Sequence, residues 1–489
     1  MKKYILALLS TVFLNASVNI NNVNLKITYE SVELPKGETM GLAGVSQLYD
    51  IGKNLYLGGG IYGTLDGKRG GFFTGGIDGG YKTNLTDRFW LDTGVFVGGG
   101  GGGAAPQGGG LMLRPYIDIL YDTGSFKSGL SLSKVKFPNG DIDSNQVAFT
   151  IEHSYQQLFI TNPFSSESIN HTLKLYDKHI NFKNEYYGLT VQSYHPNKGK
   201  DLGGNPTQDI KLIGFEYSKE LKQNLYGLFQ TAGANDGGAD GYAEVLFGLR
   251  YLKPLSNDLD LEFRTSLGSA GGGKVDTGGG AVYKVGAGLN YNTKNFYLNL
   301  LGGYFGSDGS FKAEYAKAGV GFRDHFASFG DGFIRYDNKA GYNRWDFRIV
   351  NQTYQENSLM RKSKKLSGDL QLMGFKFDRS ITQDFYISAQ AMGAYKGDAG
   401  GYAVGLVGIG YKKEFGKLSF VTEALGGAGG GGGIATGDAL IYQVQAGLGY
   451  KLSENFDIEL TKGKVKAKNG TLNSDTLEVG IRYRFFTIR

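Results

Sequence analysis

The chain repeats itself three times, and this repetition constrains its fold more than any other feature of the sequence. Three matching segments read GYAEVLFGLRY, GYAVGLVGIGY and GFFTGGIDGGY, and they lie at 241–251, 401–411 and 71–81. A second trio of similar segments follows in the same order, beginning at Leu113, Tyr283 and Tyr442. These matches divide the chain into three repeats, at approximately 23–160, 181–326 and 345–489.

Within each repeat the pattern has a period of two, which is typical of β-strands with one apolar face. In the segment 241–251, Val245 and Phe247 lie on an apolar face, while Glu244 and Arg250 lie on the other. The third repeat divides into eight strands, which start near Trp345, Leu370, Phe385, Tyr402, Leu418, Ile441, Phe456 and Leu477. Three repeats of this kind predict an all-β protein with about 24 antiparallel strands.

The composition excludes several other classes of protein. The chain has 80 glycines in 489 residues, more than twice the usual share of roughly 7%. Collagen is excluded because only 8 prolines are present and no Gly-X-Y period exists, and 32 Tyr and 31 Phe oppose disorder. The chain has no cysteine, so disulfides and thiolate metal sites are ruled out. The net charge of +6 is small and scattered, and we expect no nucleic-acid partner.

The N-terminus has the pattern of an export signal. Lys2 and Lys3 precede the mostly apolar stretch Tyr4–Leu14, and small residues follow at Ala16 and Ser17. This arrangement predicts a cleaved signal peptide over 1–16, with a cut after Ser17 as the alternative. The mature chain, 17–489, is then expected to form a single β-barrel domain without a helical anchor, since a spanning helix needs about 20 apolar residues.

Tyrosines recur at corresponding strand ends, which favours a membrane barrel over a soluble β-fold. Aromatic side chains gather where the apolar band of a membrane barrel meets the lipid headgroups, because the ring is apolar and the hydroxyl reaches water. The tyrosines that fit such a girdle are Tyr81, Tyr251, Tyr411, Tyr121, Tyr291 and Tyr450. A soluble β core closed by the same tyrosines is the alternative.

The C-terminal strand supports the membrane interpretation. Polar Glu478, then Gly480, then Tyr483 and Phe485 follow one another near the end of the chain. This pattern resembles the terminal-strand signal of Gram-negative outer-membrane β-barrel proteins, although four residues follow Phe485 here. The resemblance is to the class as a whole. It implies a bacterial outer-membrane location, with outer-membrane lipid, the barrel-assembly machinery and periplasmic chaperones as partners.

Two barrel architectures are compatible with 24 strands: one wide barrel, or three barrels of eight strands in one chain. We expect the single barrel, because the polar faces carry charges that a wide, wet lumen accommodates more easily than a filled one. Such a lumen predicts an outer-membrane channel for passive diffusion of small solutes or ions. Its predicted pore-lining residues are Asp78, Glu244, Arg250, Glu262, Arg264, Glu423, Arg482 and Arg484.

Glycine tracts recur between the fifth and sixth strands of each repeat, at 98–110, 268–280 and 426–437. We expect flexible external hairpin ends here, and strand ends approached closely by another backbone are the alternative. A repeated glycine-rich tip also supports a second function, a surface-display or interaction barrel.

An outer-membrane hydrolase is the least favoured function. Four of the five histidines, His153, His171, His179 and His195, lie within 43 residues, but their spacing matches no catalytic or metal motif. We therefore predict no enzymatic activity, no cofactor and no metal.

Overall fold

The computed structural model describes residues 18–160, 180–197, 201–329, 342–355 and 365–488, and these ranges form 24 antiparallel strands. No helix in the described ranges is both long and apolar enough to span a bilayer. The predicted signal peptide falls outside the described residues, so it stays a prediction.

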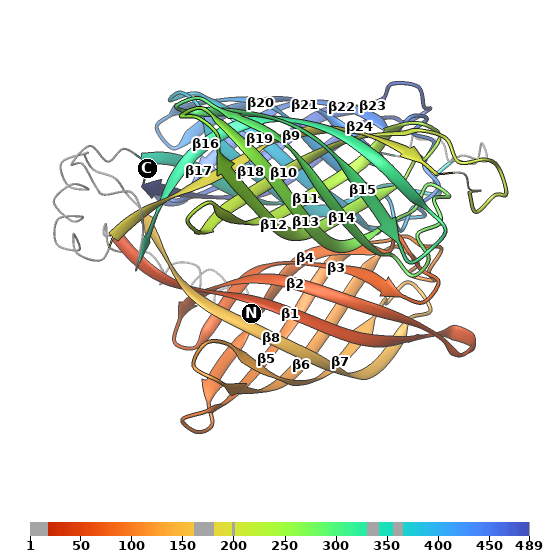
Figure 1. Ribbon diagram of the computed structural model, residues 1–489, viewed down its shortest axis with the longest axis horizontal. Helices are drawn as coiled ribbons and strands as arrows, with labels where there is room; N and C mark the ends of the chain where they lie inside the picture. Colours follow the sequence, from red (N-terminus) through yellow and green to blue (C-terminus); the bar gives the residue numbers. More distant parts are fainter. Residues whose placement is uncertain (1–17, 161–179, 198–200, 330–341, 356–364, 489) are drawn as a thin grey trace.

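The first repeat forms one closed barrel of eight strands (Figure 1). Its strands are β1 (Val18–Leu34), β2 (Glu38–Gly52), β3 (Leu55–Asp66), β4 (Phe73–Asn84), β5 (Phe89–Gly101), β6 (Leu111–Asp122), β7 (Lys127–Lys136) and β8 (Asp143–Ile160). A short 3-10 turn, η1 (Pro35–Gly37), joins β1 to β2. The barrel closes because β1 pairs with β8, from Val18 opposite Ile160 to Glu30 opposite Ala148.

The second repeat forms another closed barrel in the same way. Its strands are β9 (Ile180–Pro196), β10 (Ile210–Lys222), β11 (Leu225–Asp236), β12 (Ala243–Pro254), β13 (Leu259–Gly271), β14 (Ala281–Asn292), β15 (Phe296–Ser307) and β16 (Lys312–Phe329). Here β16 pairs with β9, from Ala313 opposite Pro196 to Phe329 opposite Ile180.

The third repeat completes the set with β17 (Tyr342–Tyr354), β18 (Leu370–Ser380), β19 (Phe385–Lys396), β20 (Ala403–Phe415), β21 (Leu418–Gly430), β22 (Leu440–Lys451), β23 (Phe456–Ala467) and β24 (Asn473–Ile488). Closure is again between first and last strands, since β17 pairs with β24. The strand starts expected near Leu370, Phe385, Leu418 and Phe456 are confirmed to the residue.

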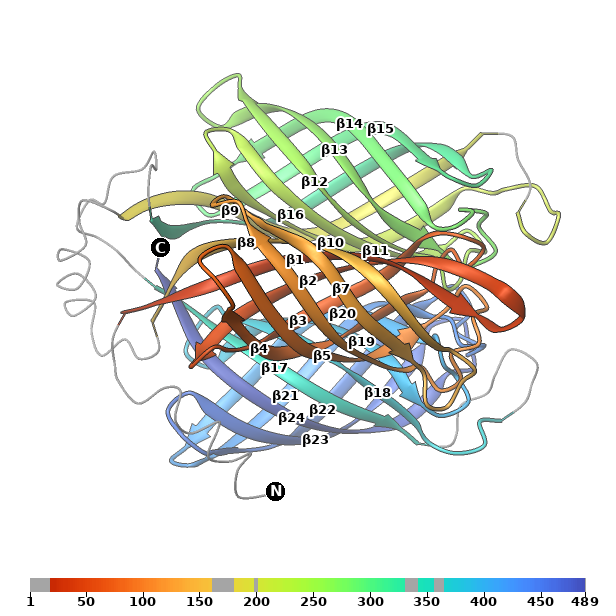
Figure 2. The ribbon, with the colours of Figure 1, turned by 90° about the horizontal axis from the view of Figure 1, so that it is seen from below.

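The three barrels lie side by side (Figures 1 and 2), and the expectation of one 24-strand barrel is wrong. A single bridge, Phe486 opposite Ile160, links β24 to β8 where a continuous barrel would need a full ladder. We expected one wide lumen because the water inside it would accommodate charged side chains. That reason fails because the charges pair with one another inside each small lumen, which removes the need for water around them.

The strands of each barrel are joined by tight turns at one end, the turn end, and mostly by longer loops at the other, the loop end, where the three-residue η1 is an exception. In the turn between β2 and β3, Lys53 and Asn54 both have positive φ, 47° and 68°. Two such residues give the two-residue turn that matches the twist of a β-hairpin. The loop end includes the β1–β2 hairpin, which extends to the right in Figure 1.

The outward faces of the strands are apolar. Leu132, Leu267 and Leu448 are 65%, 67% and 62% exposed. Apolar surface that the chain leaves exposed in this way is unfavourable in water and favourable in lipid. Near the turn end, an exposed row of tyrosines follows the predicted girdle, comprising Tyr81, Tyr121, Tyr251, Tyr291 and Tyr450.

Because each barrel closes on its own strands, one repeat should fold without the other two. Residues 342–489, expressed alone behind a signal peptide, should give a compact barrel that changes electrophoretic mobility on heating. The same assay on the full chain is the control. A fragment that stays unfolded while the full chain folds would contradict independent closure.

Candidate functional site

The lumen of each barrel contains a layer of charged side chains about halfway along its strands. In the second barrel, Arg264 Nη1 lies 3.0 Å from Glu216 Oε2, and Arg250 Nη2 lies 3.0 Å from Glu262 Oε2. Lys317 forms a further ion pair with Glu216. All five side chains are at most 6% exposed, so they are almost completely shielded from water.

Glu244 lies in the same lumen as a second centre of this network. Its carboxylate accepts hydrogen bonds from Tyr194 Oη at 2.6 Å and from Lys284 Nζ at 3.1 Å. Gln230 Nε2 donates to the same oxygen as Lys284, at 3.2 Å from Glu244 Oε1, and Tyr242 Oη donates to Oε2 at 3.4 Å. A buried carboxylate with four donors is compensated for the loss of its hydration.

In the third barrel, two arginines occupy the centre of the lumen. Arg482 Nη1 lies 2.6 Å from Asp346 Oδ2, and its Nε lies 2.7 Å from Glu459 Oε1. Arg348 Nε lies 2.8 Å from Asp378 Oδ2, and Arg348 also pairs with Glu423. Arg482 and Arg348 are each 1% exposed. Their planar guanidinium groups hold several carboxylates at once.

The first barrel uses different residues for the same purpose. Lys26 Nζ lies 3.0 Å from Asp92 Oδ2 and also pairs with Asp118. Arg114 Nε lies 2.7 Å from Glu30 Oε1. Asp78 accepts hydrogen bonds from Ser46 Oγ at 2.9 Å and from Tyr116 Oη at 2.7 Å. The charge layer is therefore present in all three barrels.

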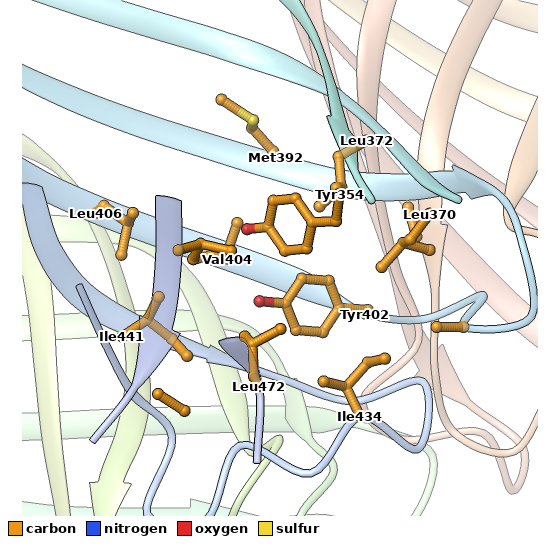
Figure 3. Close-up of a cluster of buried hydrophobic side chains, with 14 of the residues drawn as sticks. Tyr354, Leu370, Leu372, Met392, Tyr402, Val404, Leu406, Ile434, Ile441 and Leu472 are labelled. Carbon is orange, nitrogen blue, oxygen red and sulfur yellow. The ribbon is translucent and has the colours of Figure 1, made fainter. Parts of the chain in front are cut away.

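A buried apolar cluster closes the loop end of each lumen. In the third barrel, three loops contribute Tyr402, Ile434 and Leu472, each at most 1% exposed (Figure 3). Tyr402 packs against Tyr354 with ring centroids 5.9 Å apart. The corresponding loop residues are Tyr242, Val275 and Phe311 in the second barrel, and Phe72, Ala105 and Phe137 in the first. We call these clusters the caps.

All eight predicted pore-lining residues lie inside a barrel, but they are divided among three lumens. Asp78 is in the first, four are in the second (Glu244, Arg250, Glu262 and Arg264) and three are in the third (Glu423, Arg482 and Arg484). Their pore-lining role stays a prediction.

Sequence reasoning missed the opposite charges that pair with these residues, notably Lys284, Arg348 and Lys376. Arg348 alternates with outward-facing Phe347 and Ile349 on β17, so the period of two could have placed it inside.

The glycine tracts lie where neighbouring barrels meet. Gln107 Nε2 donates to Gly400 O at 3.1 Å, joining the first and third barrels. Ser269 Oγ donates to Thr64 O at 2.6 Å, joining the second and first. The third and second barrels are joined by Thr436 Oγ1, which donates to Asp240 Oδ1 at 2.7 Å. The three interfaces form a closed cycle at the loop end, which we call the glycine ring.

Backbones approach so closely in this ring that only glycine fits. A Cβ on Gly70 would lie 2.6 Å from Gly278 O, between the first and second barrels. A Cβ on Gly430 would lie 2.8 Å from Gly241 N, between the third and second. The favoured expectation of flexible hairpin ends is therefore wrong, and the alternative of close backbone approach is what the structure shows.

The proposed assembly-signal residues occupy both faces of β24. Glu478 points into the lumen, where Lys376 Nζ lies 2.7 Å from its Oε1. Tyr483 and Phe485 stack with ring centroids 6.1 Å apart, and Tyr483 also packs against Phe456. Gly480 lies on β24 between Glu478 and Tyr483. The role of all four residues in assembly stays a prediction.

The histidines form no catalytic arrangement within the described ranges. His195 Nδ1 lies 2.8 Å from Asp209 Oδ2 on an exposed surface, and His153 Nδ1 lies 3.0 Å from Ser125 O. His171 and His179 fall outside the described residues. No group of three or more potential metal ligands occurs in the part of the chain that the structure describes.

Two loop carboxylates at the loop end have lowered pKa values. The Ser310 hydroxyl donates to Asp276 at 2.7 Å and holds the pKa of that carboxyl below its usual value. The backbone N–H of Asn205 does the same for the pKa of Asp201. Hydrogen bonds to the charged form stabilise it, so these loops are held in defined conformations by ionised groups.

No family model matches the sequence, and no curated protein matches it significantly. Among solved structures, the chain is similar to a point mutant of the ferric enterobactin receptor of Pseudomonas aeruginosa, with 11% identity, a TM-score of 0.28, and coverage of 96% of this chain and 82% of that one. It is also similar to OpdQ of Pseudomonas aeruginosa (10% identity, TM-score 0.23, coverage 96% and 97%) and OccAB3 of Acinetobacter baumannii (11%, 0.23, 96% and 99%).

These neighbours are Gram-negative outer-membrane β-barrel proteins, the class that the terminal strand resembles.

Breaking one central ion pair should destabilise the third barrel strongly. Arg482→Leu leaves Asp346 and Glu459 buried without their shared partner, which should cost about 3–5 kcal/mol of unfolding free energy. Lys417→Ala, at an exposed turn of the same barrel, should cost about 1 kcal/mol or less. Urea unfolding in detergent measures both, and equal losses would contradict the role given to the charge layer.

Filling the glycine ring should separate the first barrel from the other two. Gly70→Val with Gly393→Val inserts side chains against the backbones of both neighbours, since a Cβ on Gly393 would lie 2.6 Å from Gly99 O. Gly75→Val with Gly405→Val is the matched control, because no atom lies within about 3.9 Å of either added Cβ.

The readout is a protease site inserted in the connection 161–179, followed by size-exclusion chromatography. After cleavage, the first barrel should remain bound in the control and dissociate in the filled variant. Retention in both would show that the ring does not hold the barrels together.

Proposed function

We propose that the protein is an outer-membrane platform in which three fused barrels present one shared surface at the loop end. The observation that carries this proposal is the double closure of every lumen, by a charge layer and by a cap. A lumen without room for water against its central side chains offers no path for passive diffusion. The function is then exerted by the outer surface, and the barrels serve as its anchor.

The outer-membrane location is supported by the outward faces. Exposed leucines, the tyrosine row near the turn end and the terminal-strand pattern all suit a β-barrel surrounded by lipid. With the predicted export signal, and with β1 starting at the turn end, we propose that the turn end faces the periplasm and the loop end faces outward. We propose outer-membrane lipid, the assembly machinery and periplasmic chaperones as partners on the same basis.

The loop end has the rigidity that a binding surface needs. The glycine ring ties the three barrels together, and the caps hold the loops down over each lumen. Arg69 Nε also donates to Glu38 Oε1 at 2.8 Å, which ties the β3–β4 loop to the β1–β2 hairpin. A pre-organised surface loses little entropy on binding, so glycine-rich loops are no obstacle to an interaction role here.

Passive diffusion of small solutes or ions is the second candidate. It is supported by the polar character of all three lumens, because charged side chains point inward in every barrel. Conduction would require the ion pairs of the charge layer to exchange partners and the cap to lift. Neither candidate includes a catalytic step, and the absence of enzymatic activity stays a prediction.

Conductance in a planar lipid bilayer separates the two candidates. Purified, heat-modifiable protein should show no stable conductance, because cap and charge layer block each lumen. A steady conductance that changes in Arg250→Gln, but not in a control such as Lys417→Gln, would contradict the platform proposal and favour a channel.

A further inference from the structure

Three exposed lysines form a row on the outward face of the third barrel. Lys462, Lys464 and Lys466 alternate along β23 with inward-facing residues such as Val465, which is fully buried. Leu460, on the same outward face one step closer to the turn end, is 52% exposed. Strand β23 lies on the outer rim of the three-barrel group (Figure 2). We call these three residues the lysine row.

The lysine row lies at the level where lipid headgroups begin. With a rise of about 3.4 Å per residue and a tilt of about 40°, Lys462 stands roughly 16 Å and Lys466 roughly 26 Å beyond Phe456, which lies at the level of the aromatic girdle. The apolar band of a membrane barrel is about 25 Å tall. Lys466 therefore reaches its boundary on the loop side, and Lys462 and Lys464 can extend their ammonium groups toward the same level.

The first barrel shows what an internally balanced version of this site looks like. Lys134 and Lys136 occupy the same positions in its last hairpin, and their Nζ atoms lie 2.5 Å and 3.0 Å from the two oxygens of Asp143. In the third barrel, Asn473 stands opposite Lys466 where Asp143 stands opposite Lys136. The carboxylate opposite the outer lysine is thus replaced by a neutral amide, and the third barrel has its carboxylate, Asp475, opposite Lys464 instead, where the first barrel has Asn145.

No ion pair joins the lysine row to a carboxylate within the described residues. Asp475 is the cross-strand neighbour of Lys464, but the two form no ion pair within 4 Å. Three positive charges at about 7 Å intervals, beside an apolar surface and with only the carboxylate of Asp475 opposite them among the described residues of β24, leave an excess of positive charge that favours an anion.

We propose that the lysine row binds the phosphate groups of an anionic glycolipid in the outer leaflet. The ammonium groups take the phosphates, and the acyl chains lie along the outward surface around Leu460 and Leu448, which is 62% exposed. A lipid is the occupant because the next outward residue of β23 after the row, Leu460, is apolar and 52% exposed. This inference rests on the outer-membrane location proposed above.

The test uses the full chain, purified in detergent, and bisphosphorylated lipid A as the probe, with native mass spectrometry as the readout. Lysines near an anionic surface contribute about fivefold each to binding, so Lys462→Gln with Lys464→Gln and Lys466→Gln should weaken binding about 100-fold. Asn473→Asp, which restores the carboxylate found in the first barrel, should weaken it several-fold. Lys134→Gln with Lys136→Gln is the matched control and should change binding less than about twofold.

Three results would overturn the proposal: unchanged binding in both the triple variant and Asn473→Asp, equal binding of dephosphorylated lipid A to the unmodified chain, or tighter binding of phosphatidylglycerol than of lipid A. If the triple variant fails to fold, Asn473→Asp decides the outcome. Density-gradient fractionation of cell envelopes tests the outer-membrane location separately, so failure of the location is distinguishable from failure of the lipid site.

Discussion

The pairing of the first strand of each repeat with its last is the interaction on which the rest of the structure depends. A strand edge left open in lipid would expose unpaired N–H and C=O groups, so a repeat that closes on itself is a complete membrane unit. Closure with eight strands also fixes a lumen only wide enough to be filled by side chains. Everything inside each barrel follows from that width.

Charge in a lumen this narrow is tolerated only when it is paired. The third barrel meets the requirement by placing Arg348 and Arg482 between four carboxylates, and the second uses Arg250, Arg264 and Lys317. Such pairs need not stabilise the fold more than apolar packing would, but losing one partner is costly. The charge layer therefore gives each barrel a single arrangement of its interior, and the caps exclude water from one end of it.

The sequence predicted the strands well and the closure poorly, for a physical reason. Alternation along a strand determines which side chains point inward, so the inward positions of Asp78, Glu244 and Arg250 were accessible from local pattern. Alternation is the same in a barrel of eight strands and in one of 24, so the strand that closes the barrel is not encoded locally. The partners of the lumen charges are equally distant, as with Arg348 and Glu423, which are 75 positions apart.

The glycine tracts illustrate the same limit. Their composition indicates either freedom or crowding, and only the position of another barrel decides between them. Gln107 and Gly400, joined by a hydrogen bond, are 293 positions apart, and no pattern within one repeat reports that contact. The recurrence of the tract in every repeat was nevertheless a usable signal, because flexible tips have no physical reason to recur at one strand position, whereas a cyclic interface has.

The three repeats act as controls for one another, and this comparison separates architecture from function. Features present in all three barrels, namely the strand closure, the charge layer, the cap and the glycine contact, are what any such barrel needs in order to close and to join its neighbours. A feature confined to one barrel has no such explanation. Lys134 and Lys136 are both paired with Asp143, whereas the three lysines of the third barrel face Asn473 and Asp475 and form no ion pair within the described residues. An unbalanced charge at one of several equivalent positions is difficult to attribute to folding. We therefore attribute it to the binding of a ligand of opposite charge.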